Sequence, residues 1–370
     1  MKVLFLTNIP SPYRMDFFNE LGKYCDLDVV FERAASLERD KSWDTYTFQT
    51  FKGTILRGMN VGVDKAVSFD VFSYLNAEYD YIVIGNAATP TGIAAILYLK
   101  ARRKKYYLEG DGGIYHAGNI IKEHVKKMIL RNAAGYFSSS KELDKYYYRY
   151  GADKEKVYRY PFTSLFESDI VRSIDIEEGK RREKKRLGIE PLQMVLAVGR
   201  FIPVKGFDQL IKAAKQFEEQ AVVYIIGGTE TEEYSEIIKN YKIKNVKLLE
   251  FMQKEELFAY YQAADVFVFP SRGDAWGLVI NEAMAFGIPV VTTKSCVAGL
   301  ELIENGVNGY VVPVDDVLEL SKKIRMILCD VSLKKSMIQN NLKKIQNYTI
   351  EKMVIEHIKV FEGLKNGEIK

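Results

Sequence analysis

The chain has 370 residues, of which 47% are hydrophobic and 28% are charged. Because a domain commonly holds about 100 to 200 residues, this length predicts two domains. The apolar content lets each of them bury a core, which excludes the disordered and fibrous classes. Lys and Arg total 53 against 49 Asp and Glu, a formal net charge of +4, so we do not expect a nucleic-acid-binding protein.

The cysteines and the apolar runs indicate the compartment. The three cysteines are widely spaced and include no Cys-x-x-Cys pair. Neither a disulfide framework nor a zinc site is therefore expected, and this usage is typical of a reducing compartment. The opening MKVLFLTN is too short an apolar run for a secretory signal, and no run approaches the about 18 residues of a transmembrane helix. We expect a soluble, cytoplasmic protein.

The first half of the sequence alternates short apolar segments with helical ones. Strands are predicted at 2–8, 26–33, 79–86, 104–110 and 134–140, with helices such as 91–102 and 141–151 between or after them. Short apolar runs without polar alternation, flanked by helices, are typical of a parallel sheet that is buried on both faces.

A polar and charged segment, 161–190, follows, and we interpret it as an interdomain connection that carries a solvated helix. The alternation then restarts. Strands are predicted at 193–200, 222–228, 246–251, 265–271, 288–293 and 308–313, and helices at 207–219, 231–240, 254–263, 278–286 and 315–328. This pattern predicts an α/β protein of two doubly wound, Rossmann-like domains, 1–160 and 191–347. A C-terminal helix at about 348–370 is able to pack back on the first domain.

The loop after the first predicted strand argues against a dinucleotide-dependent oxidoreductase. It reads NIPSPYR, and neither G-x-G-x-x-G nor a P-loop occurs there or elsewhere. Such glycines are needed where a backbone approaches a pyrophosphate closely.

Two cations follow the strand predicted at 193–200. In GRFIPVKG, Arg200 and Lys205 leave the carboxyl end of that strand, which is where open α/β sheets bind ligands. Two cations beside turn-forming glycines suit a diphosphate. The alternative is that both are ordinary surface residues of a connecting loop.

The segment PSRGDAWGLVINEAMAFGIPVV carries two carboxylates eight residues apart, Asp274 in a loop and Glu282 in the helix that follows. Backbone N–H groups near 276–278 would make an anion site at the helix N-terminus. The carboxylates would accept hydrogen bonds from sugar hydroxyls. As isolated carboxylates, Asp274 would rather be interpreted as a helix-cap or turn residue and Glu282 as a solvated position on a helix face.

The order of GRFIPVKG, SRGDAWGLVINEAMAFGIPVV and NGYVVP resembles the retaining, family 4 type of glycosyltransferases with the GT-B fold. The opening TNIPSPYRMDFFNEL is similar to bacterial members. The resemblance implies two Rossmann-like domains facing a deep cleft, with a nucleotide-sugar held mainly by the C-terminal one. It also implies transfer of the sugar, from a UDP- or GDP-sugar, to a glycan or lipid-linked acceptor in the biosynthesis of cell-surface polysaccharide or glycoconjugates.

By position, Arg200 and Lys205 match the pair that holds the donor diphosphate, and Glu282 matches the acid that binds ribose. Asp274 stands where the family usually has a Glu that contacts the donor sugar, a departure that looks like a DAWG subgroup. The donor-binding residues that the resemblance implies are Gly199, Arg200, Lys205, Gly228, Phe251, Met252, Asp274, Trp276, Gly277, Leu278 and Glu282.

The N-terminal half matches less closely. Its first loop, with Ser11, Pro12, Tyr13 and Arg14, stands in place of a glycine-rich phosphate loop and is a candidate acceptor site. Many members carry a histidine near the donor sugar, and here Glu109 and His116 lie near that position. A structural role for either residue is the alternative.

The resemblance to GT-B enzymes, which generally need no metal, implies that no metal is required. No cofactor is expected either, since the nucleotide-sugar is a substrate. Two other activities stay open. One is a binding or scaffold subunit on the same fold that has lost catalysis, and the other is a nucleotide-sugar epimerase, which the presence of only three histidines disfavours.

The region 100–131 has nine basic and three acidic residues and ends in the amphipathic segment IIKEHVKKMILR. Such a segment predicts peripheral contact with anionic lipid at the inner face of the cell membrane, suited to a lipid-linked acceptor. An ordinary core-facing helix with a solvated basic face is the alternative.

Overall fold

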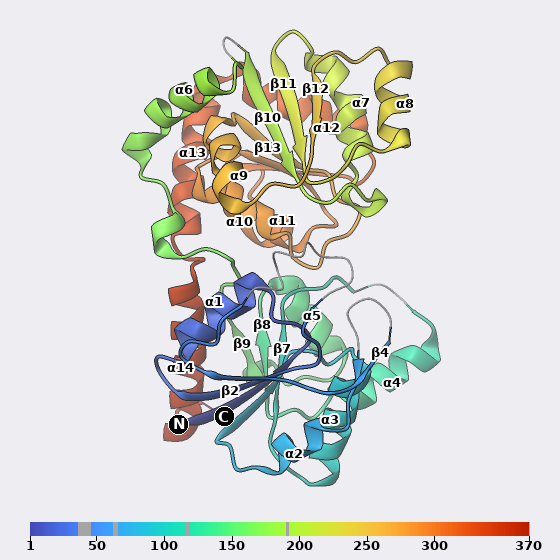
Figure 1. The fold of residues 1–370 in the computed structure, drawn as a ribbon, viewed down its shortest axis with the longest axis vertical. Helices are drawn as coiled ribbons and strands as arrows, with labels where there is room; N and C mark the ends of the chain where they lie inside the picture. The colour runs from blue at the N-terminus through green and yellow to red at the C-terminus, as the bar shows by residue number, and fades with distance from the viewer. Residues whose placement is uncertain (36–45, 62–65, 116–117, 190–191, 370) are drawn as a thin grey trace. The chain divides into compact units, whose positions relative to one another are not determined.

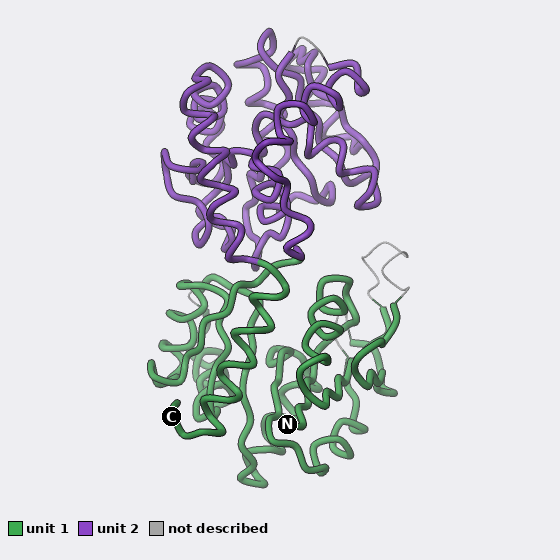
Figure 2. The backbone as a smooth tube through the Cα atoms, turned by 90° about the vertical axis from the view of Figure 1, so that its left-hand side faces the viewer, with its two compact units in different colours: residues 1–164, 349–370 green, residues 165–348 purple. Residues whose placement is uncertain are grey.

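The structure, a computed structural model, describes residues 1–35, 46–61, 66–115, 118–189 and 192–369. The chain divides into two compact units (Figure 2). Unit 1 contains residues 1–164 together with 349–370, and unit 2 contains 165–348. The last residues of the chain therefore belong to the same unit as the first.

Unit 1 is built on a parallel sheet with the strand order β3-β2-β1-β6-β7-β8-β9 (Figure 1). Its strands are β1 (Lys2–Thr7), β2 (Asp26–Phe31), β3 (Lys52–Ile55), β6 (Tyr81–Ile84), β7 (Tyr107–Gly110), β8 (Gly135–Ser138) and β9 (Val157–Arg159), and β4 (Met59–Asn60) with β5 (Ala66–Val67) forms an antiparallel pair. Every residue of β6 and β8 is buried, as expected when helices cover both faces of a parallel sheet.

The helices of unit 1 are α1 (Pro12–Leu21), α2 (Val71–Asn76), α3 (Pro90–Ala101), α4 (Ile120–Leu130), α5 (Lys141–Arg149), the short η2 (Lys154–Lys156) and α14 (Ile350–Asn366). Local signals set several of their ends: the Thr89 hydroxyl accepts a hydrogen bond from Gly92 N at the start of α3, with Pro90 in the first turn. Helix α14 packs on α1, and its Phe361 ring stacks on Tyr81 with 4.6 Å between centroids.

Unit 2 has a second parallel sheet with the order β12-β11-β10-β13-β14-β15. Its strands are β10 (Gln193–Val198), β11 (Ala221–Ile226), β12 (Val246–Leu249), β13 (Val266–Phe269), β14 (Val290–Thr293) and β15 (Gly309–Val312). The helices are α6 (Ile176–Arg186), α7 (Phe207–Ala214), α8 (Glu232–Asn240), α9 (Lys254–Ala263), α10 (Leu278–Ala285), α11 (Val297–Leu302), α12 (Val317–Cys329) and α13 (Val331–Ile345), with short turns η3 (Glu167–Asp169), η4 (Ser173–Asp175), η5 (Pro203–Lys205) and η6 (Lys215–Phe217).

Both units have the Rossmann-like, doubly wound parallel architecture that the sequence predicts. Each predicted strand contains or overlaps an observed one, whereas the short edge strands β3 and β9 escaped prediction because their sequences are not apolar runs. No helix among the described residues combines the length and apolar character needed to cross a membrane.

The segment that we interpreted as a connection differs from that expectation. Its helix α6 packs on α9 and falls in unit 2. The reason is electrostatic: Lys180 Nζ lies 3.4 Å from Asp265 Oδ1 and Lys184 Nζ lies 2.5 Å from Asp265 Oδ2, and Asp265 is buried. Lysines that a sequence pattern assigns to solvent thus hold the helix against the sheet.

Candidate functional site

The chemistry-bearing motifs of unit 2 meet at the carboxyl edge of its sheet. Strand order reverses between β10 and β13, and such a switch point is where open α/β sheets bind ligands. The loop 199–206 follows β10 and the loop 270–277 follows β13. The two segments that we singled out from the sequence are therefore neighbours.

A glycine lets these two loops approach closely. Gly206 has φ 70°, and a Cβ placed on it would lie 2.1 Å from the carbonyl oxygen of Pro270. No side chain fits there, and the left-handed conformation also favours glycine. The glycine at this point is thus required by backbone packing between the loops after β10 and β13.

Lys205 and Asp274 form an ion pair across these loops, in which Lys205 Nζ donates to Asp274 Oδ2. The Lys205 ammonium also lies 5.2 Å from the centroid of the Phe269 ring. The two side chains are mostly covered, 18% and 15% exposed. Sequence reasoning assigned them to different parts of the donor, whereas the structure shows that they neutralise each other.

The loop 274–277 is fixed by hydrogen bonds at both ends. Asp274 N donates to Ser295 O at 3.0 Å, and Asp274 Oδ1 accepts from Trp276 N at 3.3 Å. The Trp276 side chain is buried, and its Nε1–H donates to Asn281 Oδ1 at 2.8 Å. The indole therefore anchors the loop to α10, a role that sequence reasoning did not assign to it.

Gly277 is the N-cap residue immediately before helix α10, and its backbone is in the left-handed region, with φ 102°. A Cβ on it would lie 2.7 Å from Cys296 Sγ, so this position also requires glycine. Leu278 is the first residue of the helix and is half-buried. Because N–H groups of the first turn have no intrahelical partners, the start of α10 favours an anion.

Glu282 is positioned by a residue that the sequence did not reveal. Its Oε2 accepts a hydrogen bond of 2.8 Å from the hydroxyl of Tyr261 on α9. Burial, together with the neighbouring carboxylate, raises the pKa of Tyr261 well above its ordinary value, so the phenol stays protonated as a donor. This bond orients the Glu282 carboxylate.

The remaining predicted donor residues of unit 2 lie at the same edge. Gly199 and Arg200 follow β10 and are half-buried, Gly228 follows β11, and Phe251 and Met252 follow β12. Phe251 is 47% exposed. Arg272, which was not predicted as a site residue, joins the loop after β13 to two other segments of unit 2. Its guanidinium donates to Asp208 at 2.8 Å and to Asp315 at 2.7 Å.

Glu109 of unit 1 is the penultimate residue of β7, but its side chain is fully buried. Arg14 Nη1 donates to Glu109 Oε1 at 2.5 Å, and Arg14 Nη2 pairs with Asp111. His357 Nε2 lies 3.4 Å from Glu109 Oε2. Glu109, a candidate catalytic residue from the sequence, is thus an inaccessible partner of an ion cluster.

This ion cluster shifts the pKa values of its two carboxyl groups in opposite directions. Burial raises the pKa of Glu109, but Arg14 and His357 outweigh it and hold that pKa well below its usual range. Burial, reinforced by the charge of Glu109 and opposed by Arg14, raises the pKa of Asp111 to about 6.

Two of the four residues predicted in the first loop of unit 1 are buried. Ser11 and Arg14 are buried, Pro12 is exposed, and Tyr13 packs edge-on against Phe162 with 5.6 Å between ring centroids. His116 lies outside the described residues. No group of three or more His, Cys, Asp and Glu side chains that could hold a metal occurs in the part of the chain that the structure describes.

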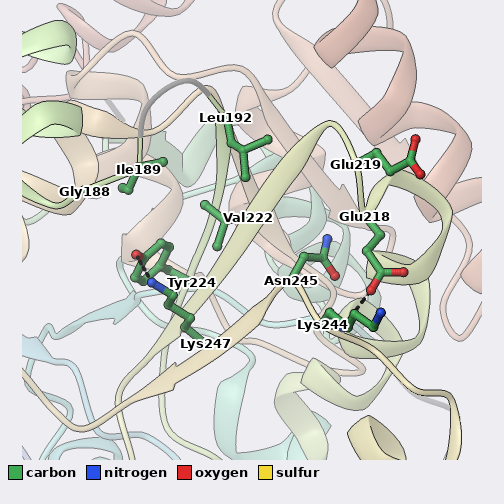
Figure 3. Close-up of a pocket in the computed structure, with 10 residues that line it drawn as sticks. All are labelled: Gly188, Ile189, Leu192, Glu218, Glu219, Val222, Tyr224, Lys244, Asn245 and Lys247. Atoms are coloured by element: carbon green, nitrogen blue, oxygen red, sulfur yellow. Dashed lines mark hydrogen bonds between the residues drawn. The ribbon is translucent and has the colours of Figure 1, made fainter.

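A cavity of about 500 Å³ lies elsewhere in unit 2, at the amino ends of β11 and β12 (Figure 3). It is lined by Gly188, Ile189, Leu192, Glu218, Glu219, Val222, Tyr224, Lys244, Asn245 and Lys247. None of these is a predicted site residue, and Lys247 Nζ, 3.0 Å from the Tyr224 hydroxyl, already has a partner there. The cavity is therefore separate from the edge described above.

The chain is similar in sequence to known and uncharacterized glycosyltransferases. Residues 179–344 match the family described as "Glycosyl transferases group 1". The chain is 25% identical over 314 residues to an uncharacterized glycosyltransferase of Methanocaldococcus jannaschii, covering 80% of this chain and 88% of that protein. It is 26% identical to the capsular polysaccharide biosynthesis glycosyltransferase CapM of Staphylococcus aureus, over 53% of this chain and 51% of CapM.

The fold is that of GT-B glycosyltransferases. Anabaena Alr3699/HepE, solved in complex with UDP, superposes with a TM-score of 0.76 over 99% of this chain and 100% of that one, at 20% identity. The segment 179–344 that matches the group 1 family contains the whole edge of unit 2 described above.

Proposed function

We propose that this chain, whose C-terminal half matches the group 1 glycosyl transferases, is a retaining glycosyltransferase. It moves a sugar from a UDP- or GDP-sugar to a glycan or lipid-linked acceptor in the biosynthesis of cell-surface polysaccharide. The observation that carries the proposal is the juxtaposition of Lys205, Asp274 and the start of α10 at the switch point of the unit 2 sheet.

The donor diphosphate would bind Arg200, Lys205 and the N-terminus of α10. When the bond between sugar and phosphate breaks, negative charge grows on the leaving diphosphate, and donors already in place stabilise it. Lys205 is paired with Asp274. A bound phosphate would replace Asp274 as the partner of the Lys205 ammonium, and the Asp274 carboxylate would be released. Asp274 would then accept hydrogen bonds from the sugar hydroxyls.

Glu282 would bind the ribose. Its carboxylate lies within α10, beyond the first turn, and Tyr261 orients it. Exposed Phe251, after β12, would lie against the base. HepE, a relative by fold, was solved with UDP, and CapM is a capsular polysaccharide enzyme. Both support the proposed classes of donor and product.

The purified chain, incubated with UDP-, GDP- and ADP-sugars and a lipid-linked or glycan acceptor, is expected to release the nucleoside diphosphate and form a glycoside with the donor's anomeric configuration. Proton NMR of the product measures the configuration. EDTA should leave the rate unchanged, because no step is assigned to a metal. A scaffold subunit would bind the donor without turnover, and an epimerase would change the sugar without releasing diphosphate.

We further propose that α4 contacts anionic lipid at the inner face of the membrane. Ile129 and Leu130 are buried and anchor the helix to unit 1, while four other apolar residues on it are exposed. They are Ile120, Ile121, Val125 and Met128, with exposed fractions of 75%, 72%, 45% and 49%. Lys122, Lys126, Lys127 and Arg131 are also exposed, so this helix carries exposed apolar and basic side chains together. The ribbon of α4 lies at the periphery of the unit (Figure 1).

The double substitution of Ile121 and Val125 by Asp should abolish co-sedimentation with vesicles that contain phosphatidylglycerol, because it places charge where apolar side chains would insert. Lys126→Glu should weaken binding more than fivefold, since each basic residue near an anionic surface contributes about 1 kcal/mol. Leu318→Asp, at an equally exposed position on α12 (75%), is the control and should bind like the wild type. Equal binding of all variants would contradict a lipid contact at α4.

A further inference from the structure

The ion pair between Lys205 and Asp274 joins the loops after β10 and β13, but donor binding as proposed above would open it. A bound diphosphate would take the place of Asp274 beside Lys205, and the two loops would lose this contact between their side chains. Unless a second connection holds the loops, the ammonium would also lose its position. Such a connection must keep its partners when the donor binds.

The backbone of Arg272 makes one connection of this kind. Arg272 lies two residues before Asp274, and its N–H donates to the carbonyl oxygen of Val204 at 2.8 Å. The same oxygen accepts a hydrogen bond of 3.0 Å from the hydroxyl of Ser271. Val204 directly precedes Lys205 in η5. The backbone just before one member of the ion pair therefore holds the backbone just before the other.

The guanidinium of Arg272 adds three further contacts. Nη1 donates to the carbonyl oxygen of Pro203 at 2.6 Å, Nη2 to Asp208 Oδ2 at 2.8 Å and Nε to Asp315 Oδ1 at 2.7 Å. Pro203 is the first residue of η5, Asp208 lies in the first turn of α7, and Asp315 precedes α12. One planar group thus fixes the turn that carries Lys205 against two neighbouring elements of unit 2.

The contact between Arg272 and Asp208 is a covered ion pair. The side chain of Asp208 is 9% exposed and that of Arg272 is 28% exposed. Burial raises the pKa of Asp208, but hydrogen bonds from Arg272 and Gln209 outweigh it and hold that pKa below its usual value. Asp208 is therefore ionised at neutral pH. By contrast, the partner Asp315 is 50% exposed, and pairs with exposed charges contribute little.

We propose that Arg272 is a positioning residue for glycosyl transfer, which holds Lys205 in place while that lysine exchanges Asp274 for the donor diphosphate. The inference rests on the proposed function. Arg272 acts through Lys205, since its guanidinium donates to protein groups on both sides of η5. An ammonium that is held in place before the reaction stabilises the leaving diphosphate without a cost of reorganisation.

Arg272→Met tests the proposal. It should lower kcat/KM for the donor about 100-fold, because a misplacement of about 1 Å has an effect of that size. Combined with Lys205→Ala, the same substitution should change kcat/KM by less than about threefold, since residues that act as a unit have non-additive effects. Arg325→Met, at an exposed position of α12, is the control and should retain wild-type kinetics.

Arg272→Lys separates position from charge. Lysine keeps a cation beside Asp208, so the midpoint of urea unfolding should stay near that of the wild type. An ammonium on a flexible stem does not reproduce the planar fork of a guanidinium, and less than about a tenth of the wild-type kcat/KM should therefore remain. Recovery of both stability and activity in Arg272→Lys would overturn the proposal. So would independent, multiplicative losses in the double variant, which would indicate that Arg272 contacts the donor itself.

Hydrogen exchange tests the positioning role without any donor. The N–H groups of Lys205 and Gly206 donate to Ile202 O and Pro203 O within η5 and its end. In Arg272→Met these two amides should exchange faster than in the wild type, while those of β10 and β13 keep their protection. Unchanged exchange at Lys205 and Gly206 would overturn the proposal. If the wild type binds no nucleotide-sugar although this exchange increases, the proposed function fails and the positioning of Lys205 stands.

Discussion

Lys205→Ala is expected to reduce kcat for glycosyl transfer by about 10²- to 10³-fold, the effect of losing one preorganised donor to a developing anion. Lys205 is the cation that joins the loops after β10 and β13 through Asp274. Its removal withdraws one charge from the leaving diphosphate. It also leaves the Asp274 carboxylate, only 15% exposed, without its cation beside the phosphates, so donor binding should weaken too.

Arg200→Ala is expected to cost a similar factor, since Arg200 is the second cation proposed for the diphosphate. Lys215→Ala is the matched control: Lys215 is more exposed, lies in η6 of the same unit, and contacts Glu218 and the carbonyl of Lys242, away from the carboxyl edge of the sheet. The double variant Lys205→Ala/Asp274→Asn should bind the donor more tightly than Lys205→Ala, because the unpaired carboxylate is gone. Near-normal rates in both single variants would refute the diphosphate assignment.

Arg14→Met is expected to destabilise unit 1 by about 3–5 kcal/mol, the typical cost of leaving buried charges uncompensated. Arg14 is buried and is the shared cation of Glu109 and Asp111. Methionine keeps the length of the apolar stem, so the lost charge dominates. Urea unfolding followed by far-UV circular dichroism should show the unit 1 transition at lower denaturant, while the exposed control Arg102→Met leaves it in place.

The pH dependence of this stability has a defined sign. The cluster lowers the pKa of Glu109 below its unfolded value. A depressed pKa stabilises the folded state above the ordinary carboxylate pKa, and that contribution is lost as pH falls through the folded pKa. The difference in the free energy of unfolding between wild type and Arg14→Met should therefore be large at pH 7 and shrink on acidification. A difference that is constant with pH would argue against a charge effect.

The strand and helix pattern was predictable because parallel strands buried on both faces are continuous apolar runs. The loops 199–206 and 270–277 were also predictable as a pair, since both follow strands of one sheet. The packing of helix α6 was not predictable, although a helix was expected in this segment. Its burial depends on the ion pairs of Lys180 and Lys184 with Asp265, which is distant in sequence.

The side-chain roles at the two edges were harder to predict for the same reason. Nothing near Glu109 in the sequence reveals that Arg14 and His357 enclose it, because these come from opposite ends of the chain. The orientation of Glu282 depends on Tyr261 from the preceding helix. Residue identity suggests a charge in each case, but only the tertiary contacts show whether that charge is accessible.

The most direct test of the central claim is isothermal titration of the chain with UDP, GDP and the corresponding sugar nucleotides. Binding of one nucleoside diphosphate per chain is expected, with affinity reduced at least tenfold by Arg200→Ala and by Lys205→Ala and unchanged by Lys215→Ala. Absence of binding by the wild type, or equal affinity in all four proteins, would contradict a donor site at the switch point of the unit 2 sheet.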